Sequence, residues 1–326
     1  MREISYSHAL REALQEELRR DADVFLIGED IGAGGGAFRV TEGLLDEFGP
    51  DRVVDTPISE SAIVGASIGA AMLGLRPVAE IMLADLISLA ADQIVGAAKV
   101  HYVHAGRLML PLVIRTANAG DAGWGPYHGQ SADAWFLNIP GLKLVMPSSP
   151  YDAKGLLKAA IRDPNPVLFY EDKALYSSKG PVPDGEYTLP LGLADVKREG
   201  KDATIVALAR AVITSLRAAD VLAQQGIEAE VIDLRTLVPL DKITIVNSVE
   251  KTGKLVIVHE SAKRGGAGAE ISAMVAEEAI EYLEAPIVRV ANPNVAVPFS
   301  PVMFDHVIPT PERVVAGVEK VMAYGA

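Results

Sequence analysis

One glutamate stands where an apolar helix is expected to begin. The run Asp55-Thr56-Pro57-Ile58-Ser59-Glu60 closes a short apolar strand, and the residues at 61–73 predict the helix. Proline and serine are typical of first helical positions, where the helix dipole favours negative charge, so Glu60 could be only a helix-start acid. The helix, however, is apolar on nearly every face and is expected to be buried all round. A buried carboxylate needs a partner or a function.

A histidine lies in a segment that is rich in glycine and aromatic residues. His128 follows Trp124 and Tyr127 within a few positions. Loop histidines are often simply solvated, but an imidazole can gain or lose a proton near neutral pH, which makes His128 a candidate acid or base. Trp124 and Tyr127 could shape a pocket beside it, or could equally be packing anchors at an interface.

Two glycine-rich stretches could hold a phosphate or another anion. The stretch 32–37 formally matches G-x-G-x-x-A, but no helix is expected directly after it, which disfavours a dinucleotide site. The stretch 265–268 follows an expected strand that ends at His259, and it precedes a helix expected from Glu270. An anion could bind at that helix N-terminus, and close packing of strand against helix explains these glycines equally well.

Helical and strand patterns alternate along the chain, as in an α/β protein. Short apolar runs such as 24–28 and 167–170 are typical of buried parallel strands. The proline-rich and glycine-rich segment near 172–195 predicts an exposed linker. We therefore expect two α/β domains, residues 1–175 and 201–326, joined by a linker at 176–200.

Composition limits the class of protein. The chain has 326 residues, 49% of them hydrophobic, which allows a large core. It has no cysteine, which excludes disulfides and cysteine-bound metals. A formal net charge of −13 disfavours nucleic acid and anionic membranes and suits a basic partner surface. No apolar signal segment or bilayer-spanning run is present, so a cytoplasmic location is expected.

Several ordered motifs together resemble the β subunit of the thiamine-diphosphate-dependent, decarboxylating first component of 2-oxo acid dehydrogenase complexes. These motifs are DTPISE at 55–60, the stretches 74–80, 92–93, 127–131, 140–143, 152–157 and 161–166, and DLRTL at 233–237. The resemblance covers essentially the whole chain. It implies an N-terminal pyrimidine-binding thiamine-diphosphate fold and a C-terminal transketolase-like domain.

The resemblance gives Glu60 a catalytic role. A glutamate at this motif hydrogen-bonds the pyrimidine ring of thiamine diphosphate and promotes the imino tautomer that deprotonates the thiazolium carbon. Glu29 matches a second acid that neighbours the first, although it could also be a solvated loop acid. Ile58 and Leu86 match positions that contact the cofactor. Leu86 departs from the family, which commonly places a stacking aromatic ring there, so cofactor affinity is expected to be lower.

The resemblance also assigns His128. The matching histidine faces the cofactor and assists acyl transfer to the lipoyl group, with Trp124 and Tyr127 shaping the acyl pocket. The family more often reads His-Ser-Gln, so Gly129 is a departure that removes a hydroxyl beside the expected acid/base.

Some relatives hold a structural potassium ion through backbone carbonyls. The matching positions here are Leu112, Ala160, Ile161, Asp163 and Asn165. Without the resemblance, most of them would be only a helix C-terminus followed by a proline turn.

One expected motif is missing. Thiamine enzymes hold the diphosphate through Mg²⁺ bound by a Gly-Asp-Gly motif and a later asparagine, and the stretch 120–123 lacks the third glycine. The resemblance therefore implies an α subunit that carries the Mg²⁺ motif, a heterotetramer of two α and two β chains, and a dihydrolipoyl acyltransferase core. Relatives often carry an acid where this chain has Ala296, which leaves docking to that core open.

The resemblance implies oxidative decarboxylation of pyruvate or a branched-chain 2-oxo acid, with acyl transfer to lipoamide. Acetoin cleavage by the same residues is an alternative. A self-sufficient transketolase-like enzyme would need the missing metal motif, and a non-catalytic scaffolding subunit would not need Glu60 or His128.

Overall fold

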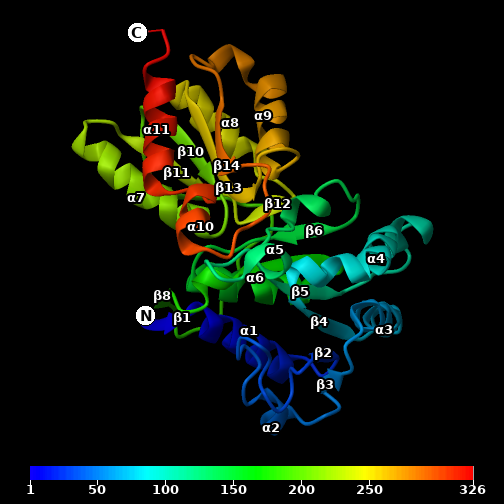
Figure 1. Ribbon diagram of the computed structural model, residues 1–326. Coiled ribbons are helices and arrows are strands. Elements are labelled where there is room, and N and C mark those ends of the chain that lie inside the picture. The colour runs from blue at the N-terminus through cyan, green and yellow to red at the C-terminus, as the bar shows by residue number, and fades with distance from the viewer. Residues whose placement is uncertain (326) are drawn as a thin grey trace. The chain divides into compact units, whose positions relative to one another are not determined.

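The computed structural model describes residues 1–325, which group into two compact units (Figure 1). The first unit comprises Met1–Asn118 and Asn138–Leu191, and the second comprises residues 119–137 with 192–325. The stretch 119–137, which holds His128, therefore groups with the second unit although it lies inside the range expected for the first domain.

The first unit is built on a parallel sheet. Six of its strands lie in the order β6-β7-β5-β4-β2-β3. Their bounds are Val24–Glu29 (β2), Val53–Thr56 (β3), Arg76–Leu83 (β4), Val113–Asn118 (β5), Lys143–Val145 (β6) and Val167–Asp172 (β7). Strands β5 and β7 are buried along their whole length, as parallel strands covered on both faces should be.

Helices connect these strands. They are α1 (Tyr6–Arg20), α2 (Leu44–Phe48), α3 (Glu60–Met72), α4 (Ala91–Val103) and α6 (Pro150–Arg162), with the 3₁₀ helices η1 (Ala84–Ala90) and η3 (Lys173–Leu175). Helix α1 lies against α6, where the buried Lys154 ammonium group lies 2.6 Å from a Glu16 carboxylate oxygen and 3.1 Å from one of Glu12. Burying an ammonium group is tolerated because its charge is paired.

The segment expected to be a linker contains regular structure. Strand β8 (Lys179–Val182) pairs antiparallel with β1 (Arg2–Ser5), and β9 (Asp195–Arg198) joins the sheet of the second unit. The side chain of Val182 is fully buried in a small cluster with Ile4 and Ala9. The prolines of this segment therefore occur in and between edge strands rather than in free chain.

The second unit has a five-stranded sheet in the order β14-β13-β10-β11-β9, in which only β9 is antiparallel. The other strands are β10 (Ala203–Ala207), β11 (Ala229–Asp233), β13 (Leu255–Ala262) and β14 (Val288–Asn292), and the short strand β12 is Thr236–Val238. The helices are α5 (Gly125–His128), α7 (Arg210–Gln224), α8 (Lys242–Thr252), α9 (Ala267–Glu278), α10 (Pro301–Val307) and α11 (Pro311–Met322), with the 3₁₀ helices η2 (Asp133–Trp135) and η4 (Ile280–Tyr282).

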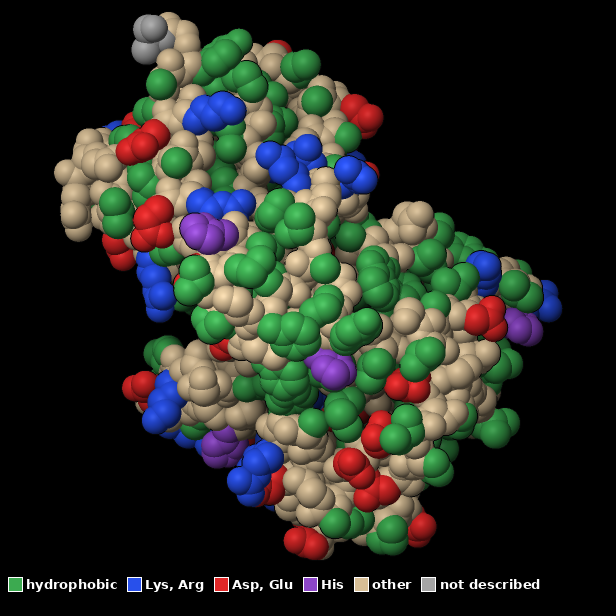
Figure 2. Space-filling view, in the orientation of Figure 1, with side chains coloured by type: hydrophobic (Ala, Val, Ile, Leu, Met, Phe, Trp, Pro, Cys, Tyr) green, Lys and Arg blue, Asp and Glu red, His purple; other side chains and the backbone are tan. Residues whose placement is uncertain are grey.

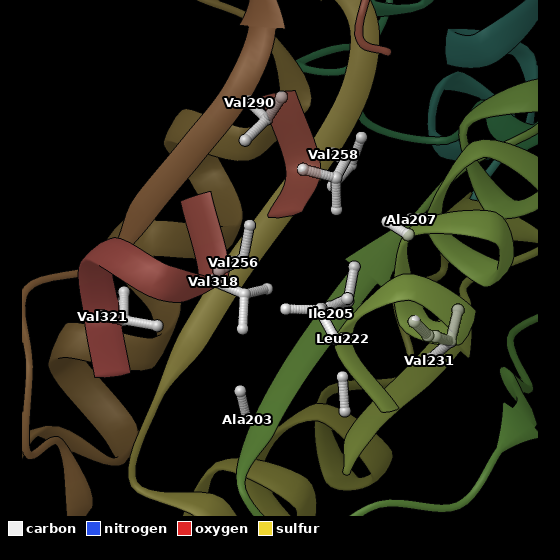
Figure 3. Close-up of a cluster of buried hydrophobic side chains, with 14 of the residues drawn as sticks. Ala203, Ile205, Ala207, Leu222, Val231, Val256, Val258, Val290, Val318 and Val321 are labelled. Atoms are coloured by element: carbon white, nitrogen blue, oxygen red, sulfur yellow. The ribbon is translucent and has the colours of Figure 1, made fainter. Parts of the chain in front are cut away.

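The hydrophobic core of the second unit lies between its sheet and helices α7 and α11 (Figure 3). Ile205 and Val256 extend from neighbouring strands toward Leu222 of α7 and Val318 of α11. Each of these four side chains is at most 1% exposed. Small and branched side chains alternate here, which lets both helices approach the sheet closely.

The predicted α/β architecture is confirmed, but the expectation that the apolar helix at 61–73 is buried all round is wrong. Helix α3 is buried on one face only: Ile63 and Val64 are buried, whereas Ala62, Ala66 and Met72 are exposed in the single chain. An apolar sequence cannot separate burial inside a chain from burial against another chain. None of the helices within residues 1–325 is long and apolar enough to cross a membrane.

Candidate active site

The first unit offers a ligand site at the carboxyl edge of its sheet. Strand β2 has β3 on one side and β4 on the other, so the connections that leave β2 and β3 run in opposite directions along the sheet. In open parallel sheets, ligands bind beyond the carboxyl ends of the strands at such a switch point. Strand β2 ends at Glu29, β3 ends at Thr56, and Leu86 follows β4 within η1.

Glu60 is the first residue of α3 and is 8% exposed. Its carboxylate makes no hydrogen bond or ion pair with any residue in the described part of the chain. The preceding Ser59 makes no side-chain cap either, and the dipole of α3 places positive potential at the helix N-terminus where Glu60 lies. A nearly buried acid without a protein partner is the arrangement expected of a group that awaits a ligand.

The structure brings Glu29 close to Glu60. Burial raises the pKa of Glu29, and the negative charges of Asp30 and Glu60 raise it further. Repulsion between neighbouring carboxylates favours the protonated form of Glu29. The sequence predicted this neighbourhood through the family resemblance alone.

A buried hydroxyl at the same edge was not singled out by the sequence. Oγ1 of Thr56, the last residue of β3, is buried and has no hydrogen-bond partner within residues 1–325. Nearby, Asp55 accepts a hydrogen bond of 2.7 Å from the backbone N–H of Gly32, which ties the loop after β2 to the end of β3. The site therefore has a fixed backbone and unsatisfied polar side chains, which fits a polar ring such as an aminopyrimidine.

The two apolar positions expected to contact the cofactor differ in exposure. Leu86 is half-buried in η1, whereas Ile58 is 73% exposed.

Lys173, directly after β7, is a further residue that no sequence pattern indicated. Burial lowers its pKa to about 8, against the opposing charges of Asp85 and Asp172, so this ammonium group is poised to titrate near neutral pH.

The segment with His128 forms the short helix α5 in the second unit. His128 and Tyr127 are exposed, Tyr127 by 76%, and Trp124 is half-buried. The chain after α5 stays close to the helix, because the side chain of Gln130 donates a hydrogen bond of 2.7 Å to the carbonyl of Pro126. The three residues predicted to shape a pocket therefore lie within one turn of each other and are open to a partner or substrate.

Two polar contacts tie this segment to the sheet of the second unit. Asp121 accepts a hydrogen bond of 2.7 Å from Arg210, which also forms a two-pronged ion pair with Glu260. Ser261 donates a hydrogen bond of 3.2 Å to the buried carboxylate of Asp133. The position of His128 is thus set by residues that lie far away in the sequence.

The structure explains the departure at Gly129. A Cβ atom there would lie 2.8 Å from the carbonyl oxygen of Gly125 and 3.2 Å from Cβ of Trp124. The ring of Phe299 packs as closely against Gly125, where a Cβ would meet it at 2.3 Å. This tight turn has no room for the serine that relatives often carry, so the missing hydroxyl is a consequence of packing.

Hydrogen bonds already reach the carbonyls expected to hold potassium. The carbonyl of Leu112 accepts from the backbone N–H of Val167 at 2.9 Å, and that of Ala160 from the backbone N–H of Asp163 at 3.2 Å. The carbonyl of Ile161 accepts from the guanidinium group of Arg76 at 3.0 Å. The carboxylate of Asp163 accepts from the backbone N–H of Asn165 at 2.9 Å. Each carbonyl oxygen retains a second lone pair, so a cation can still be accommodated.

Within residues 1–325 the structure has no cluster of three or more histidine, aspartate or glutamate side chains that could hold a metal ion. Asp121, the acid of the incomplete motif at 120–123, is ion-paired with Arg210.

Comparison with known proteins first defines the class. The family model "Transketolase, pyrimidine binding domain" matches residues 2–179, and "Transketolase, C-terminal domain" matches residues 192–314. A solved structure, "Split gene transketolase, inactive beta4 tetramer", has the same fold, with a TM-score of 0.81 and 24% identity over 99% of both chains. The chain therefore carries both domains of a transketolase-like, thiamine-diphosphate-dependent enzyme.

Full-length relatives narrow the class to one family. The chain is 47% identical to "2-oxoisovalerate dehydrogenase subunit beta" of Bacillus subtilis, covering 98% of this chain and 99% of the relative. It is 46% identical to "Acetoin:2,6-dichlorophenolindophenol oxidoreductase subunit beta" of the same organism, covering 97% and 96%. It is 44% identical to "Pyruvate dehydrogenase E1 component subunit beta-2, mitochondrial" of Oryza sativa, covering 98% and 86%. The chain belongs to this family of dehydrogenase β subunits, which work beside an α partner.

Proposed function

We propose that this chain, together with an α subunit, decarboxylates a 2-oxo acid, either pyruvate or a branched-chain acid, and transfers the acyl group to lipoamide. The observation that carries the proposal is the nearly buried, unpartnered carboxylate of Glu60 beside Glu29 at the carboxyl edge of the first sheet. The relatives act on three different substrates by name, and their identities of 44–47% do not separate them.

The chain's own residues would bind and orient the cofactor. Thiamine diphosphate, when bound, supplies a nucleophilic carbon and an electron sink for decarboxylation. Glu60 would hold a proton at the pyrimidine ring nitrogen, in a position where the raised pKa of Glu29 keeps a second proton close. The unpartnered hydroxyl of Thr56 is a further group that can hydrogen-bond the ring, and Ile58 and Leu86 would cover it and exclude water.

His128 would move a proton during acyl transfer to the lipoyl thiol, with Trp124 and Tyr127 forming the wall of the acyl pocket. An exposed position suits this role, because the lipoyl group must arrive from another protein of the complex.

The remaining parts of the site would come from partners. We propose that an α subunit supplies the Mg²⁺ and diphosphate contacts within a heterotetramer of two α and two β chains. An acyltransferase core would dock on the β chains although Ala296 replaces the usual acid. The same proposal includes a cytoplasmic location and a potassium ion held by the backbone carbonyls of Leu112, Ala160, Ile161, Asp163 and Asn165.

The deciding experiment measures thiamine-dependent decarboxylation by this chain with and without an α subunit of the same organism. Pyruvate, 3-methyl-2-oxobutanoate and acetoin are tested in parallel. We expect activity only in the mixture, and the preferred compound identifies the substrate. Activity of this chain alone would overturn the shared site, and full activity of a mixture carrying both Glu60→Gln and His128→Ala would indicate a scaffolding subunit.

A further inference from the structure

A second cavity lies wholly within the second unit, apart from His128, Trp124 and Tyr127. It has a volume of about 200 Å³ and lies beyond the carboxyl ends of β13 and β14. The segment after α5 closes one side through Trp135, and the loop before α9 closes another through Arg264. Carboxyl ends of neighbouring parallel strands are where open α/β sheets bind small ligands.

Asn292 gives this cavity a buried polar group without a partner. The residue is the last of β14, is 8% exposed and contributes to the cavity wall. Its backbone carbonyl accepts a hydrogen bond of 2.8 Å from the N–H of Lys263, so its position is fixed. Its side-chain oxygen is buried and has no hydrogen-bond partner among the described residues. Buried acceptors are rarely left without a donor, so a donor on a ligand is the natural partner.

Arg264 supplies positive charge at the same cavity. Its side chain lines the cavity, is exposed, and makes no hydrogen bond or ion pair within residues 1–325, whereas its backbone N–H is held by the side chain of Asn294 at 3.1 Å. The other charged residue of the wall, Glu260, is neutralised by its ion pair with Arg210. The cavity therefore presents an unused guanidinium group, which binds carboxylates with two parallel hydrogen bonds.

The dipole of α9 adds to the positive potential near the cavity. The glycines at the start of this helix are required by packing and are not themselves evidence of a ligand. Gly265 lines the cavity, and Gly266, the next residue, precedes the 12-residue helix without a side-chain cap, so the positive end of the helix dipole begins two residues beyond the cavity wall. Cβ atoms at Gly266 and Gly268 would meet the buried His259 ring at 2.6 and 2.7 Å, so packing requires both glycines. Burial lowers the pKa of His259, which keeps its ring neutral and leaves Arg264 as the charged partner of any anion.

Apolar side chains complete the wall. Trp135, Val295 and Val297 line the cavity, and Trp135 and Val295 are 47% and 58% exposed. These side chains suit a short aliphatic group and would gain burial when one is bound.

We propose that this cavity binds a small aliphatic carboxylic acid with a hydroxyl or ammonium group on the carbon next to the carboxylate. Arg264 would pair with the carboxylate, the hydroxyl or ammonium group would donate to the side-chain oxygen of Asn292, and the aliphatic part would lie against Trp135 and Val297. Such a ligand satisfies the charge, the unpartnered acceptor and the apolar wall at once.

Calorimetry on the full chain tests the proposal with three matched probes: 2-hydroxy-3-methylbutanoate, L-valine, and 3-methylbutanoate, which lacks the donor. We expect at least one donor-bearing acid to bind about tenfold more tightly than 3-methylbutanoate, since a hydrogen bond to a buried acceptor contributes roughly that factor. Hydroxy acid and amino acid are separate arms, so the preferred donor is identified directly.

Four variants locate the binding. Asn292→Leu should abolish the preference for the donor-bearing acid, and Arg264→Gln should weaken all three acids about tenfold, because each loses a charge-assisted pair. Arg217→Gln, a matched change on the exposed face of α7, should bind like the parent chain. His128→Ala should also bind normally, which separates this cavity from the proposed substrate pocket.

Several outcomes would overturn the proposal: equal affinity of the parent chain for acids with and without the donor, unchanged binding by Arg264→Gln, or no binding of any probe at millimolar concentration. Arg264 is exposed and unpaired, so its variant is expected to fold even if Asn292→Leu does not. Failure of these tests would leave decarboxylation in the αβ mixture unaffected.

Discussion

Glu29 and Glu60 are two carboxyl groups whose proximity costs stability when both are ionised. Burial and its acidic neighbours raise the pKa of Glu29, so the folded chain favours the protonated form of this group more than the unfolded chain does. The favourable contribution is therefore fully present below the ordinary glutamate pKa and is lost as the pH rises through the raised value.

This linkage predicts the behaviour of Glu29→Gln. The variant should unfold at a higher temperature than the parent chain at neutral pH, because it removes the burial of a charged carboxylate and its repulsion with Asp30 and Glu60. The gain should shrink as the pH falls toward the ordinary carboxyl range, about pH 4.5. Thermal unfolding of both chains across this range measures the difference, and a gain that is independent of pH would contradict the linkage.

Glu60→Gln should separate catalysis from stability. We expect decarboxylation by the αβ mixture to fall by roughly 100-fold or more, as when a general acid or base is lost. The unfolding temperature should not fall, because Glu60 has no hydrogen-bond or ion-pair partner to lose among the described residues. Rates of the reconstituted enzyme and melting of the single chain give both quantities, and a destabilised variant would mean that Glu60 has a structural role.

At the scale of elements, the tight turn after α5 predicts that a larger residue at position 129 lowers stability. Gly129→Ser would place a Cβ against the Gly125 carbonyl, and relief of that contact must move the helix that carries His128. We expect a loss of about 1–3 kcal/mol in the free energy of unfolding, the usual cost of overpacking. Gly96→Ala in α4 is the control, because nothing lies within 4 Å of its added methyl group.

Urea unfolding of both variants checks this expectation. Gly96→Ala should be neutral or slightly stabilising, as alanine is favoured over glycine within a helix. If Gly129→Ser were as stable as the parent chain, the departure from the family pattern would have no packing cause.

The sequence predicted the elements of the fold but not the contacts that join distant positions. Buried parallel strands such as β5 and β7 are continuous apolar runs, which local pattern detects. The grouping of the stretch 119–137 with the second unit depends on contacts such as Asp133 to Ser261, which join distant positions and leave no local trace. The unpartnered oxygen of Asn292 is equally invisible, because only three-dimensional packing decides whether an amide finds a partner.

At the scale of the whole molecule, exposed apolar side chains indicate surfaces that other chains cover. Hydrophobic side chains reach the surface in many places (Figure 2). They include Leu73 and Leu89 beside the α3 and η1 elements, 88% and 60% exposed, and Val302 and Met303 on α10, 70% and 59% exposed. Apolar patches of this kind mark interfaces with other chains.

The α subunit should therefore stabilise this chain. Titration with the α subunit should raise the unfolding temperature of the β chain and suppress its binding of an apolar fluorescent dye, because a partner that binds only the folded state shifts the equilibrium. If the α subunit left both the unfolding temperature and the dye binding unchanged, the prediction that it covers these apolar side chains would be wrong. Leu73→Lys and Leu89→Lys, tested separately, should leave the melting of the single chain nearly unchanged and reduce the stabilisation by a partner that covers those faces.

The excursion of the chain at 119–137 has a consequence during protein synthesis. These residues leave the ribosome after β5, but Arg210 and Ser261 are made 89 and 128 residues after the Asp121 and Asp133 side chains that they hold. Meanwhile β6 and β7 can complete the sheet of the first unit. The segment with His128 is therefore expected to become ordered later than the first sheet, and a chaperone that captures it would act on a chain whose first sheet is already formed.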